Sequence, residues 1–463
     1  MLSNHGRRLM TPACICFHIA IGAVAAASIG QCAEPAITHA ETAITHAEAT
    51  VARAEIRTAE TSITLEAGTE APRMTGLALR GASPWLNQAV EALPAQVGLD
   101  NLEHALHWHL DRAASRIRPH RVDFVYFADS PRLRLRWQWR ARSAHGPIEH
   151  TIRIDNLGDR TIALPLLPSV RYDWQVDAQT ALQRFWVEKG ADTPSSEGTH
   201  ADAIKDGDSW QGTSSTYARP ILGEAREMIP YLLVHRTDAD QQGWYLGIEF
   251  SGRTHITLDR RAGSLRGEAG LNPVPAPYRT RLLPRGRFAT PTIFLGASSG
   301  GPDGAGNRLR RWVRTVLNNP RTLRNPAYPL TVSNSWGSGM AVDEPLARQM
   351  IADAHALGLE MFHLDAGWFR GVGDWYADPA KFPAGLAALA AYAHRLEMKF
   401  GLWVDWTQAG VSSQRGALNV FETATRDWLI ADPPADWKHS EPFKGVTVDL
   451  GLPAVQHWAA QEI

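Results

Sequence analysis

The feature of the sequence that most restricts its fold is a regular alternation of apolar runs and amphipathic segments after Leu330. Three runs read as strands, "LTVSNSW", "LEMFHLD" and "KFGLWVDW", and the segments between them, residues 343–357 and 385–396, read as helices. Strands that are apolar throughout, each followed by a helix, are typical of a parallel sheet covered by helices. The pattern predicts an open α/β sheet or a (β/α)8 barrel for residues 330–463. The first helix is expected to bury one stripe, formed by Leu346, Met350, Ala354 and Leu357.

Residues 62–300 have a different pattern, which predicts antiparallel β-structure. The run "RLRLRWQWR" alternates apolar and polar residues strictly, as a half-buried strand does. Two longer runs, "TIRIDNLGDRTIALPLL" and "GWYLGIEFSGRTHITLDR", each read as two strands joined by a turn. Many short strands of this kind predict a sheet-on-sheet sandwich. Residues 301–329, with a helix over 307–317 and a proline-rich bridge, are predicted to connect the two parts.

The N-terminus resembles an export signal. Two arginines precede the apolar stretch "CICFHIAIGAVAAASIG", and small residues follow it near Ala33. A transmembrane anchor is the alternative, but the apolar run is short and contains a histidine. Residues 1–33 are therefore predicted to be a signal peptide and residues 34–61 a low-complexity spacer, so that the protein is exported to the periplasm or the medium. All three cysteines lie within 1–33, which leaves none for disulfides or thiolate metal sites after cleavage.

Composition limits the classes of partner. The formal net charge is −1, so no long-range field favours nucleic acid or an anionic membrane surface beyond the export step. The segment "HALHWHL" contains three histidines, but it lacks the spacing of a zinc site, and no metal site is predicted. Composition and charge do not decide whether the chain forms a homo-oligomer.

Polar and aromatic side chains collect where the predicted parallel strands end, and such ends carry the chemistry in both candidate folds. The residues at or just past these ends are Asn334, Ser335, Trp336, Asp365, Trp368, Trp403 and Asp405. Sugar rings lie flat against indole, and sugar hydroxyls donate hydrogen bonds to carboxylates, so this edge predicts a carbohydrate site. Two alternatives stay open: the aspartates could be caps or turn residues, and the tryptophans could be core residues.

Several motifs in order carry a resemblance to a known family: "NSW", "LDAGWF", "GDWYADPAKFPAGLAALAAYAHRLEMKFGLWVDW" and "VTVDLGLPAVQHW". Together they resemble glycoside hydrolase family 36, the melibiase-type α-galactosidases. The resemblance is specific from about Thr290 onward and weaker before it. It implies an N-terminal β-supersandwich followed by the first part of a (β/α)8 barrel, a retaining α-galactosidase activity on oligosaccharides, and no cofactor.

The resemblance also implies the substrate-binding residues, which we expect to be Asp365, Trp336, Trp403, Trp375 and Asp405. Two positions depart from the family pattern. Family members have a second aspartate directly after the one that matches Asp365, whereas this chain has Ala366. After the third strand the family usually reads Trp-Phe-Glu-Pro-Glu, and this chain reads Trp-Val-Asp-Trp-Thr. An altered sugar specificity, or transglycosylation, is therefore an alternative to strict α-galactoside hydrolysis.

The catalytic residues are expected outside the sequence. In the family the nucleophilic aspartate ends the fourth barrel strand and the acid/base aspartate comes from the sixth, and both positions would follow Ile463. Only three of the eight strand–helix units are expected here, and a complete barrel takes about 250 residues. We expect the chain to be the front portion of a longer enzyme, with no catalytic carboxylate of its own. A non-catalytic sugar-binding chain or a non-functional fragment is the alternative.

Overall fold

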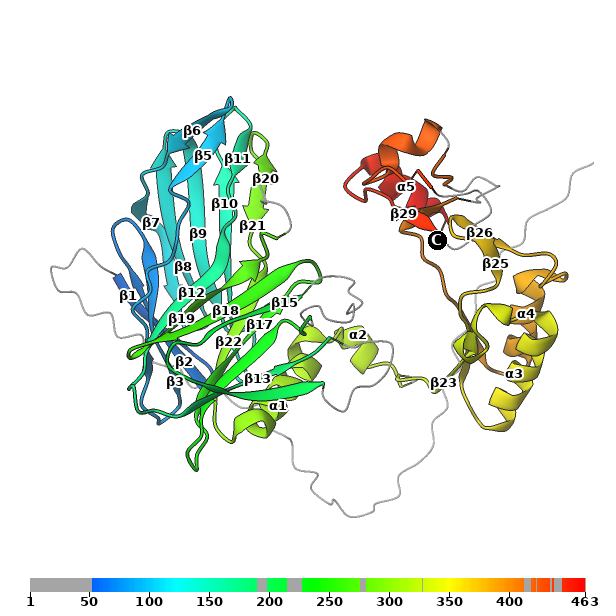
Figure 1. The fold of residues 1–463 in the computed structure, drawn as a ribbon, viewed down its shortest axis with the longest axis horizontal. Helices are drawn as coiled ribbons and strands as arrows, with labels where there is room; N and C mark the ends of the chain where they lie inside the picture. The colour runs from blue at the N-terminus through cyan, green and yellow to red at the C-terminus, as the bar shows by residue number, and fades with distance from the viewer. Residues whose placement is uncertain are drawn as a thin grey trace, which may run out of the picture. The chain divides into compact units, whose positions relative to one another are not determined.

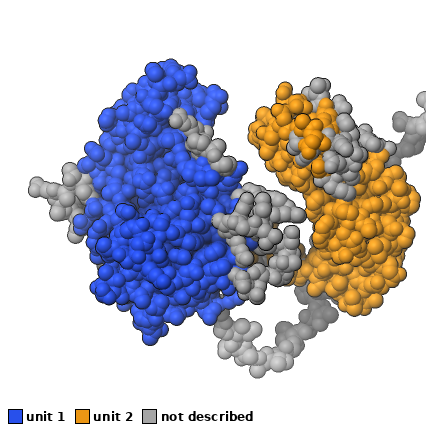
Figure 2. Space-filling model, viewed as in Figure 1, with its two compact units in different colours: residues 1–317 blue, residues 318–463 orange. Residues whose placement is uncertain are grey.

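The structure is a computed structural model of the 463-residue chain. It describes residues 52–189, 198–214, 227–274, 280–326, 328–411, 418–421, 423–433, 435–436 and 444–462. The predicted signal peptide and most of the predicted spacer lie outside these residues. The chain forms two compact units, residues 1–317 and 318–463 (Figures 1 and 2).

Unit 1 is built on one large antiparallel sheet of ten strands (Figure 1). Its order is β14-β13-β16-β17-β22-β10-β9-β8-β7, and β21 also pairs with β10. The strands are β7 (His109–Arg118), β8 (Arg121–Asp129), β9 (Arg132–Arg140), β10 (Ile148–Asn156), β13 (Leu182–Val187), β14 (Thr199–Ile204), β16 (Tyr231–Arg236), β17 (Gly243–Glu249), β21 (Arg287–Ala289) and β22 (Thr292–Ser298).

Three four-stranded antiparallel sheets complete unit 1. The first is β1 (Ala52–Arg57), β2 (Thr61–Ala67), β3 (Pro72–Leu79) and β4 (Trp85–Leu86). The second is β20 (Thr280–Leu282), β11 (Ile162–Leu164), β5 (Gln96–Leu99) and β6 (Leu102–Ala105). The third is β12 (Pro168–Gln175), β19 (Ser264–Leu271), β18 (Thr254–Arg261) and β15 (Ser209–Ser214).

The alternation within β9 forms part of the core of this unit. Its four apolar residues, Leu133, Leu135, Trp137 and Trp139, are all 0% exposed, whereas the polar residues between them are half-buried. One core cluster includes residues from all four sheets, so the sheets pack on one another through their apolar faces. The predicted β-sandwich is confirmed.

One boundary of the predicted β-region is wrong. The spacer was expected to reach residue 61, but 52–57 form β1, in which Ala54 and Ile56 are buried between polar neighbours. The two predicted strand–turn–strand units are both present, but their strands do not pair with each other. β10 and β11 belong to different sheets, as do β17 and β18, so each turn is a corner between sheets. Alternation predicts a strand but not its partner, which is chosen by contacts distant in the sequence.

The predicted connector helix belongs to unit 1. Helix α1 (Gly301–Trp312) begins six residues before the predicted start, because Pro302 fits the first turn of a helix, and a π-helical turn (Val313–Leu317) follows it. Trp312 is 2% exposed and packs with Leu233, Tyr245 and Phe294 of the large sheet. A short helix, α2 (Pro320–Leu323), comes next in the chain.

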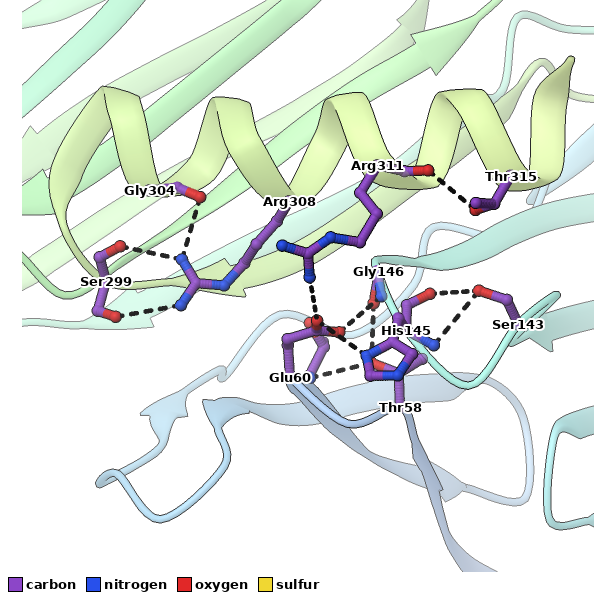
Figure 3. A network of polar contacts seen from close by, with 11 residues as sticks. Thr58, Glu60, Ser143, His145, Gly146, Ser299, Gly304, Arg308, Arg311 and Thr315 are labelled. Atoms are coloured by element: carbon purple, nitrogen blue, oxygen red, sulfur yellow. Dashed lines mark hydrogen bonds and ion pairs between the residues drawn. The ribbon is translucent and has the colours of Figure 1, made fainter. Parts of the chain in front are cut away.

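Polar contacts also fix α1 to the sandwich (Figure 3). The Glu60 carboxylate accepts a hydrogen bond from the Gly146 amide at 2.7 Å, lies 3.2 Å from the His145 ring and lies 3.8 Å from the Arg311 guanidinium. Arg308 donates to the Ser299 and Gly304 carbonyls, at 3.0 and 3.1 Å. These contacts join the β1–β2 turn, the β9–β10 loop and α1.

The core of unit 1 buries a glutamate beside a histidine. Glu91 is 6% exposed, its Oε2 accepts a hydrogen bond from Trp137 Nε1 at 3.1 Å, and His150 Nε2 lies 3.8 Å away. Burial raises the pKa of Glu91 to about 7, and burial lowers the pKa of His150 to about 3. Both side chains are therefore neutral in the folded protein near pH 6.

These shifts act on stability in opposite directions. Glu91 has a folded pKa above its unfolded value of 4.5, so its contribution is lost as pH rises from 4.5 to about 7. His150 has a folded pKa below its unfolded value of 6.5, so its contribution is lost as pH falls from 6.5 toward 3. Between pH 5 and 6.5 the two effects offset each other.

Replacing Glu91 by glutamine should isolate the pH-dependent contribution of Glu91 to stability. Glutamine still offers an oxygen to Trp137 but cannot ionise. Relative to the parent, the free energy of unfolding of Glu91→Gln is expected to rise by about 2–3 kcal/mol between pH 5 and pH 8. Urea unfolding of both proteins at the two pH values measures this change. A difference that stays constant with pH would show that Glu91 is not held neutral.

Unit 2 contains the predicted parallel sheet. β23 (Val332–Asn334), β24 (Met361–Leu364) and β27 (Lys399–Leu402) pair in parallel in the order β23-β24-β27. Helices α3 (Glu344–Ala356) and α4 (Gly385–Arg395) pack on this sheet and on each other. The strand–helix alternation is confirmed.

Helix α3 begins where the Asp343 side chain accepts a hydrogen bond from the Leu346 amide at 2.9 Å. Its predicted apolar stripe is only partly right. Ala354 is buried and Met350 packs against the core, but Leu357 is 78% exposed, while Ala347 and Ile351 are 0% exposed. The buried apolar side chains of the helix are therefore Ala347, Ile351 and Ala354, whereas Leu346 is 38% exposed.

The other elements of unit 2 lie in its loops and toward its C-terminal end. They are a 3-10 segment (Ser335–Ala341), the hairpin β25 (Phe369–Gly371) and β26 (Asp374–Ala377), the pair β28 (Gln408–Gly410) and β29 (Gly445–Thr447), a 3-10 turn (Thr423–Trp428) and helix α5 (Pro453–Glu462). Among the described residues, no helix is long and apolar enough to cross a membrane.

Candidate functional site

The ends of β23 and β24 bring together the first part of the candidate site. Asn334 Nδ2 donates a hydrogen bond to Asp365 Oδ2 at 2.9 Å, and the Asp365 amide donates to Ser335 Oγ at 2.9 Å. Parallel pairing aligns Asn334 with His363, so the strand ends lie at one edge of the sheet. Residues 31 positions apart in the sequence thus form one rim.

The Asp365 carboxylate is held in a fixed orientation. Its Oδ2 accepts from Asn334, and its Oδ1 accepts from the Ala366 amide at 2.8 Å. Each carboxylate oxygen can accept a second hydrogen bond, so both remain able to bind a hydroxyl. This geometry suits an acceptor that orients a ligand.

Aromatic rings form a second part of the site. Phe369 stacks on Trp403 at 5.9 Å and meets Trp375 edge to face at 4.9 Å. Trp375 and Trp403 lie 6.1 Å apart, and Trp368 lies 5.3 Å from Phe369. We call Trp368, Phe369, Trp375 and Trp403 the aromatic cluster. Three of the four come from the loop and hairpin after β24.

The members of this cluster differ in what they can offer a ligand. Trp368 is 1% exposed, and its Nε1 donates to the Trp403 carbonyl at 2.9 Å, so it is a core residue. Trp375 and Trp403 are half-buried. The indole N–H of Trp375 is buried and has no hydrogen-bond acceptor among the described residues, which leaves it as a donor.

Trp336 lies outside the aromatic cluster. Its side chain is 55% exposed, and its amide donates to Asn334 Oδ1 at 2.6 Å. The side chain of Asn334 therefore sets the backbone of Trp336 and also contacts Asp365. An exposed indole next to this pair is available to cover a sugar face.

Asp405 occupies a local turn. Its Oδ1 accepts from Thr407 Oγ1 at 2.6 Å, and its Oδ2 accepts from Gln408 Nε2 at 2.7 Å. Strand β27 ends at Leu402, so Asp405 lies in the following loop and not at the strand end. These contacts are typical of a turn residue, which was the alternative role left open for the aspartates in the sequence analysis.

The sequence did not predict Lys381 at the site. This residue connects two loops of the site, those that contain Met340 and Gly367. Its Nζ donates to the carbonyls of Met340 at 2.6 Å and Gly367 at 2.9 Å. Gly367 has φ +114°, and a Cβ there would lie 3.0 Å from Met340 Cα, so the two loops approach closely. Nothing in the residue pattern identifies a lysine 14 positions after the glycine as this link.

Ala366, the position that departs from the family pattern, is 7% exposed and packs within the apolar core of unit 2. Its amide, and not its side chain, serves the site by binding Asp365. The hairpin after β24 also buries Asp374, which is 0% exposed and lies 3.4 Å from the Arg370 guanidinium. In the described part of the chain, no group of three or more histidine, cysteine, aspartate or glutamate side chains is placed to hold a metal ion.

The known proteins to which this chain is similar include several α-galactosidases. Residues 287–459 match the family described as Melibiase. Alpha-galactosidase 2 of Pediococcus pentosaceus is 29% identical over 269 residues, which cover 56% of this chain and 35% of that protein. Alpha-galactosidase AgaA of Geobacillus stearothermophilus is 27% identical over 286 residues, 58% of this chain and 36% of that protein. The chain thus spans about a third of the length of these relatives.

Solved structures show the same fold. The alpha-galactosidase of Lactobacillus brevis superposes with a TM-score of 0.70 at 19% identity, covering 90% of this chain and 62% of that one. The family 36 enzyme AgaA gives a TM-score of 0.69 at 18% identity, covering 89% and 63%. The likeness in fold covers an N-terminal β-supersandwich followed by an α/β region that corresponds to part of a (β/α)8 barrel. Residues 287–459 are thus similar to the Melibiase family, and the chain is similar in fold to the family 36 α-galactosidases.

Proposed function

We propose that this chain supplies the sugar-binding part of an exported α-galactosidase-type glycosidase, which removes terminal α-galactosyl residues from oligosaccharides. The observation that carries the proposal is the fixed Asn334–Asp365 pair beside exposed and half-buried indoles. A variant of AgaA has been solved in complex with raffinose, an oligosaccharide of the proposed class.

In this proposal Asp365 binds hydroxyls of the terminal sugar and Trp336, Trp375 and Trp403 form the walls around its ring. Both oxygens of Asp365 already accept hydrogen bonds, which keeps the carboxylate in place but weakens it as a nucleophile. The nucleophile and the acid/base are assigned to a continuation of the chain, in which a Lys-x-Asp sequence should end an apolar run. Reading the DNA after Ile463 checks this assignment.

One observation favours a second candidate, a family relative with altered sugar preference. An alanine stands where the family has a second aspartate, and its side chain is buried among apolar groups. One carboxylate that could bind a galactose hydroxyl is therefore missing from the rim. A hydrogen bond to a charged group contributes about 1.5–3 kcal/mol.

The complete protein, encoded through the DNA that follows Ile463, is expected to hydrolyse 4-nitrophenyl α-galactoside slowly. Ala366→Asp is expected to raise kcat/KM by about tenfold, because it restores one charged hydrogen bond. The same change should lower the melting temperature, since an aspartate at this 7% exposed position loses part of its hydration beside an apolar cluster. Ala366→Ser serves as the control for size and polarity.

The two candidates give different results in this assay. No hydrolysis by either the parent or Ala366→Asp would contradict the glycosidase function itself. Fast hydrolysis by the parent, with the same rate in Ala366→Asp, would support the α-galactosidase function. It would contradict the altered sugar preference. Circular dichroism of each protein shows whether it has folded.

A further inference from the structure

One face of the large sheet of unit 1 is divided into two zones. In the first zone, α1 covers apolar side chains, among them Phe294 and Tyr245. Phe294 is the cross-strand partner of Glu149, so the two side chains point to the same face of the sheet. Beyond Glu149 the face becomes polar, since its residues come from the charged positions of β9 and β10.

The polar zone contains a pocket of about 300 Å³. It is lined by Gln138, Arg140, Arg142, Glu149, Thr151, Arg153, Glu249, Ala289, Thr290 and Thr292. Pockets for small molecules are mostly apolar, so a lining in which only Ala289 is apolar indicates a ligand that forms hydrogen bonds on all sides. The volume is at the lower end of the range for small-molecule sites.

Three side chains of the pocket have unused capacity. The Nε of Arg153 and the Oε1 of Glu249 are both buried and have no hydrogen-bond partner among the described residues, and the same holds for Glu149 Oε1, which lies 3.2 Å from Arg142 Nε as an ion pair. Buried donors and acceptors are nearly always paired in folded proteins. A donor and two acceptors lining the same pocket indicate a ligand that both accepts and donates hydrogen bonds.

The charges of the pocket favour an anion. Three guanidinium groups, those of Arg140, Arg142 and Arg153, face two carboxyl groups. Arg142 Nε lies 3.2 Å from Glu149 Oε1, and Glu149 and Glu249 line the same pocket. Burial and the neighbouring charge of Glu249 raise the pKa of Glu149 to about 7, against the opposing effect of Arg142 and Arg140. Near neutral pH the glutamate pair therefore holds a proton part of the time, which makes the pocket more positive.

We propose that this pocket binds a small hydroxylated carboxylate of the size of a sugar acid. The ligand carboxylate lies against the guanidinium groups of Arg140 and Arg153, whose planar donors match it. The ligand hydroxyls bind the Glu149–Glu249 pair and the threonine hydroxyls. The site is separate from the rim around Asp365 and does not depend on the function proposed for that rim.

Calorimetric titration of the 463-residue chain with D-galacturonate and D-galactose tests the proposal, since these sugars differ only in the carboxylate at C6. At pH 6 galacturonate is expected to bind at least about tenfold more tightly than galactose. Arg153→Gln should weaken galacturonate binding about tenfold or more. Arg132→Gln is the control, because Arg132 is exposed on the same strand as Arg140 and lies outside the pocket. This variant should leave the affinity for galacturonate unchanged. All titrations are repeated in Asp365→Ala, so that binding at the rim is not counted.

A pH series adds an independent readout. Galacturonate binding to the parent is expected to weaken between pH 6 and pH 8, as the glutamate pair loses its proton, and Glu149→Gln should remove this dependence. Equal binding of galactose, equal binding of acetate, or an unchanged affinity in Arg153→Gln would each overturn the proposal. Thermal unfolding of each variant confirms that it is folded.

Discussion

Replacing Asp365 by alanine is expected to lower the affinity of the chain for raffinose by about 100-fold. In the proposed function the Asp365 carboxylate accepts hydrogen bonds from the sugar, and a hydrogen bond to a charged group contributes about 1.5–3 kcal/mol. The change also releases Asn334 and the Ala366 amide, which both donate to this carboxylate. Isothermal titration calorimetry of parent and variant measures the effect.

Asp405→Asn is the matched control, because Asp405 also follows a strand of the parallel sheet. Its oxygens are bound by Thr407 and Gln408, and asparagine keeps an oxygen for one of these contacts. The affinity for raffinose is expected to change less than about threefold in this variant. A loss as large as that of Asp365→Ala would assign Asp405 to the sugar and contradict the turn role.

Trp368→Ala is expected to destabilise unit 2 by about 3–5 kcal/mol, the usual cost of removing a large buried aromatic side chain. Trp368 is 1% exposed, contacts Phe369 at 5.3 Å, and donates its indole N–H to the Trp403 carbonyl. The variant leaves a cavity and an unpaired carbonyl beneath the aromatic cluster. Denaturant unfolding followed by near-ultraviolet circular dichroism reports the change.

Trp336→Ala provides the comparison for this prediction. Trp336 is 55% exposed, so its removal should change the free energy of unfolding by less than about 1 kcal/mol. The same variant should still weaken raffinose binding, since the indole is proposed to cover the sugar. Equal destabilisation by the two tryptophan variants would show that exposure does not separate their roles.

The periodic patterns of the sequence predicted the elements of both units but not all their partners. The alternation of β9 and the strand–helix order after Leu330 follow from the spacing of apolar residues, which the core enforces. The corner between β17 and β18 was not predictable in the same way, because a turn sequence does not specify whether the chain returns to the same sheet. Helix α3 shows a related limit, since Ala347 packs closely on the sheet while the larger Leu346 stays 38% exposed.

The sequence predicted which site residues lie at the strand ends. It did not predict the contacts between the loops that follow these strands. Asn334 and Asp365 each directly follow or end an apolar run, so parallel pairing brings them together. Trp375 lies seven residues past Trp368, and only the β25–β26 hairpin places it beside Trp403. Lys381 donates to backbone carbonyl groups, which every residue has. Its role therefore could not be predicted from the residue types around it.

The corners between sheets have a consequence for how unit 1 can be divided. Strands that follow one another, such as β10 and β11, separate into different layers, while β10 pairs with β21 more than 130 residues later. Such a topology joins distant segments before any sheet is complete, which slows folding. A piece cut anywhere between Ala52 and Leu317 would expose unpaired strand edges and invite aggregation, so this half of the protein must be produced whole.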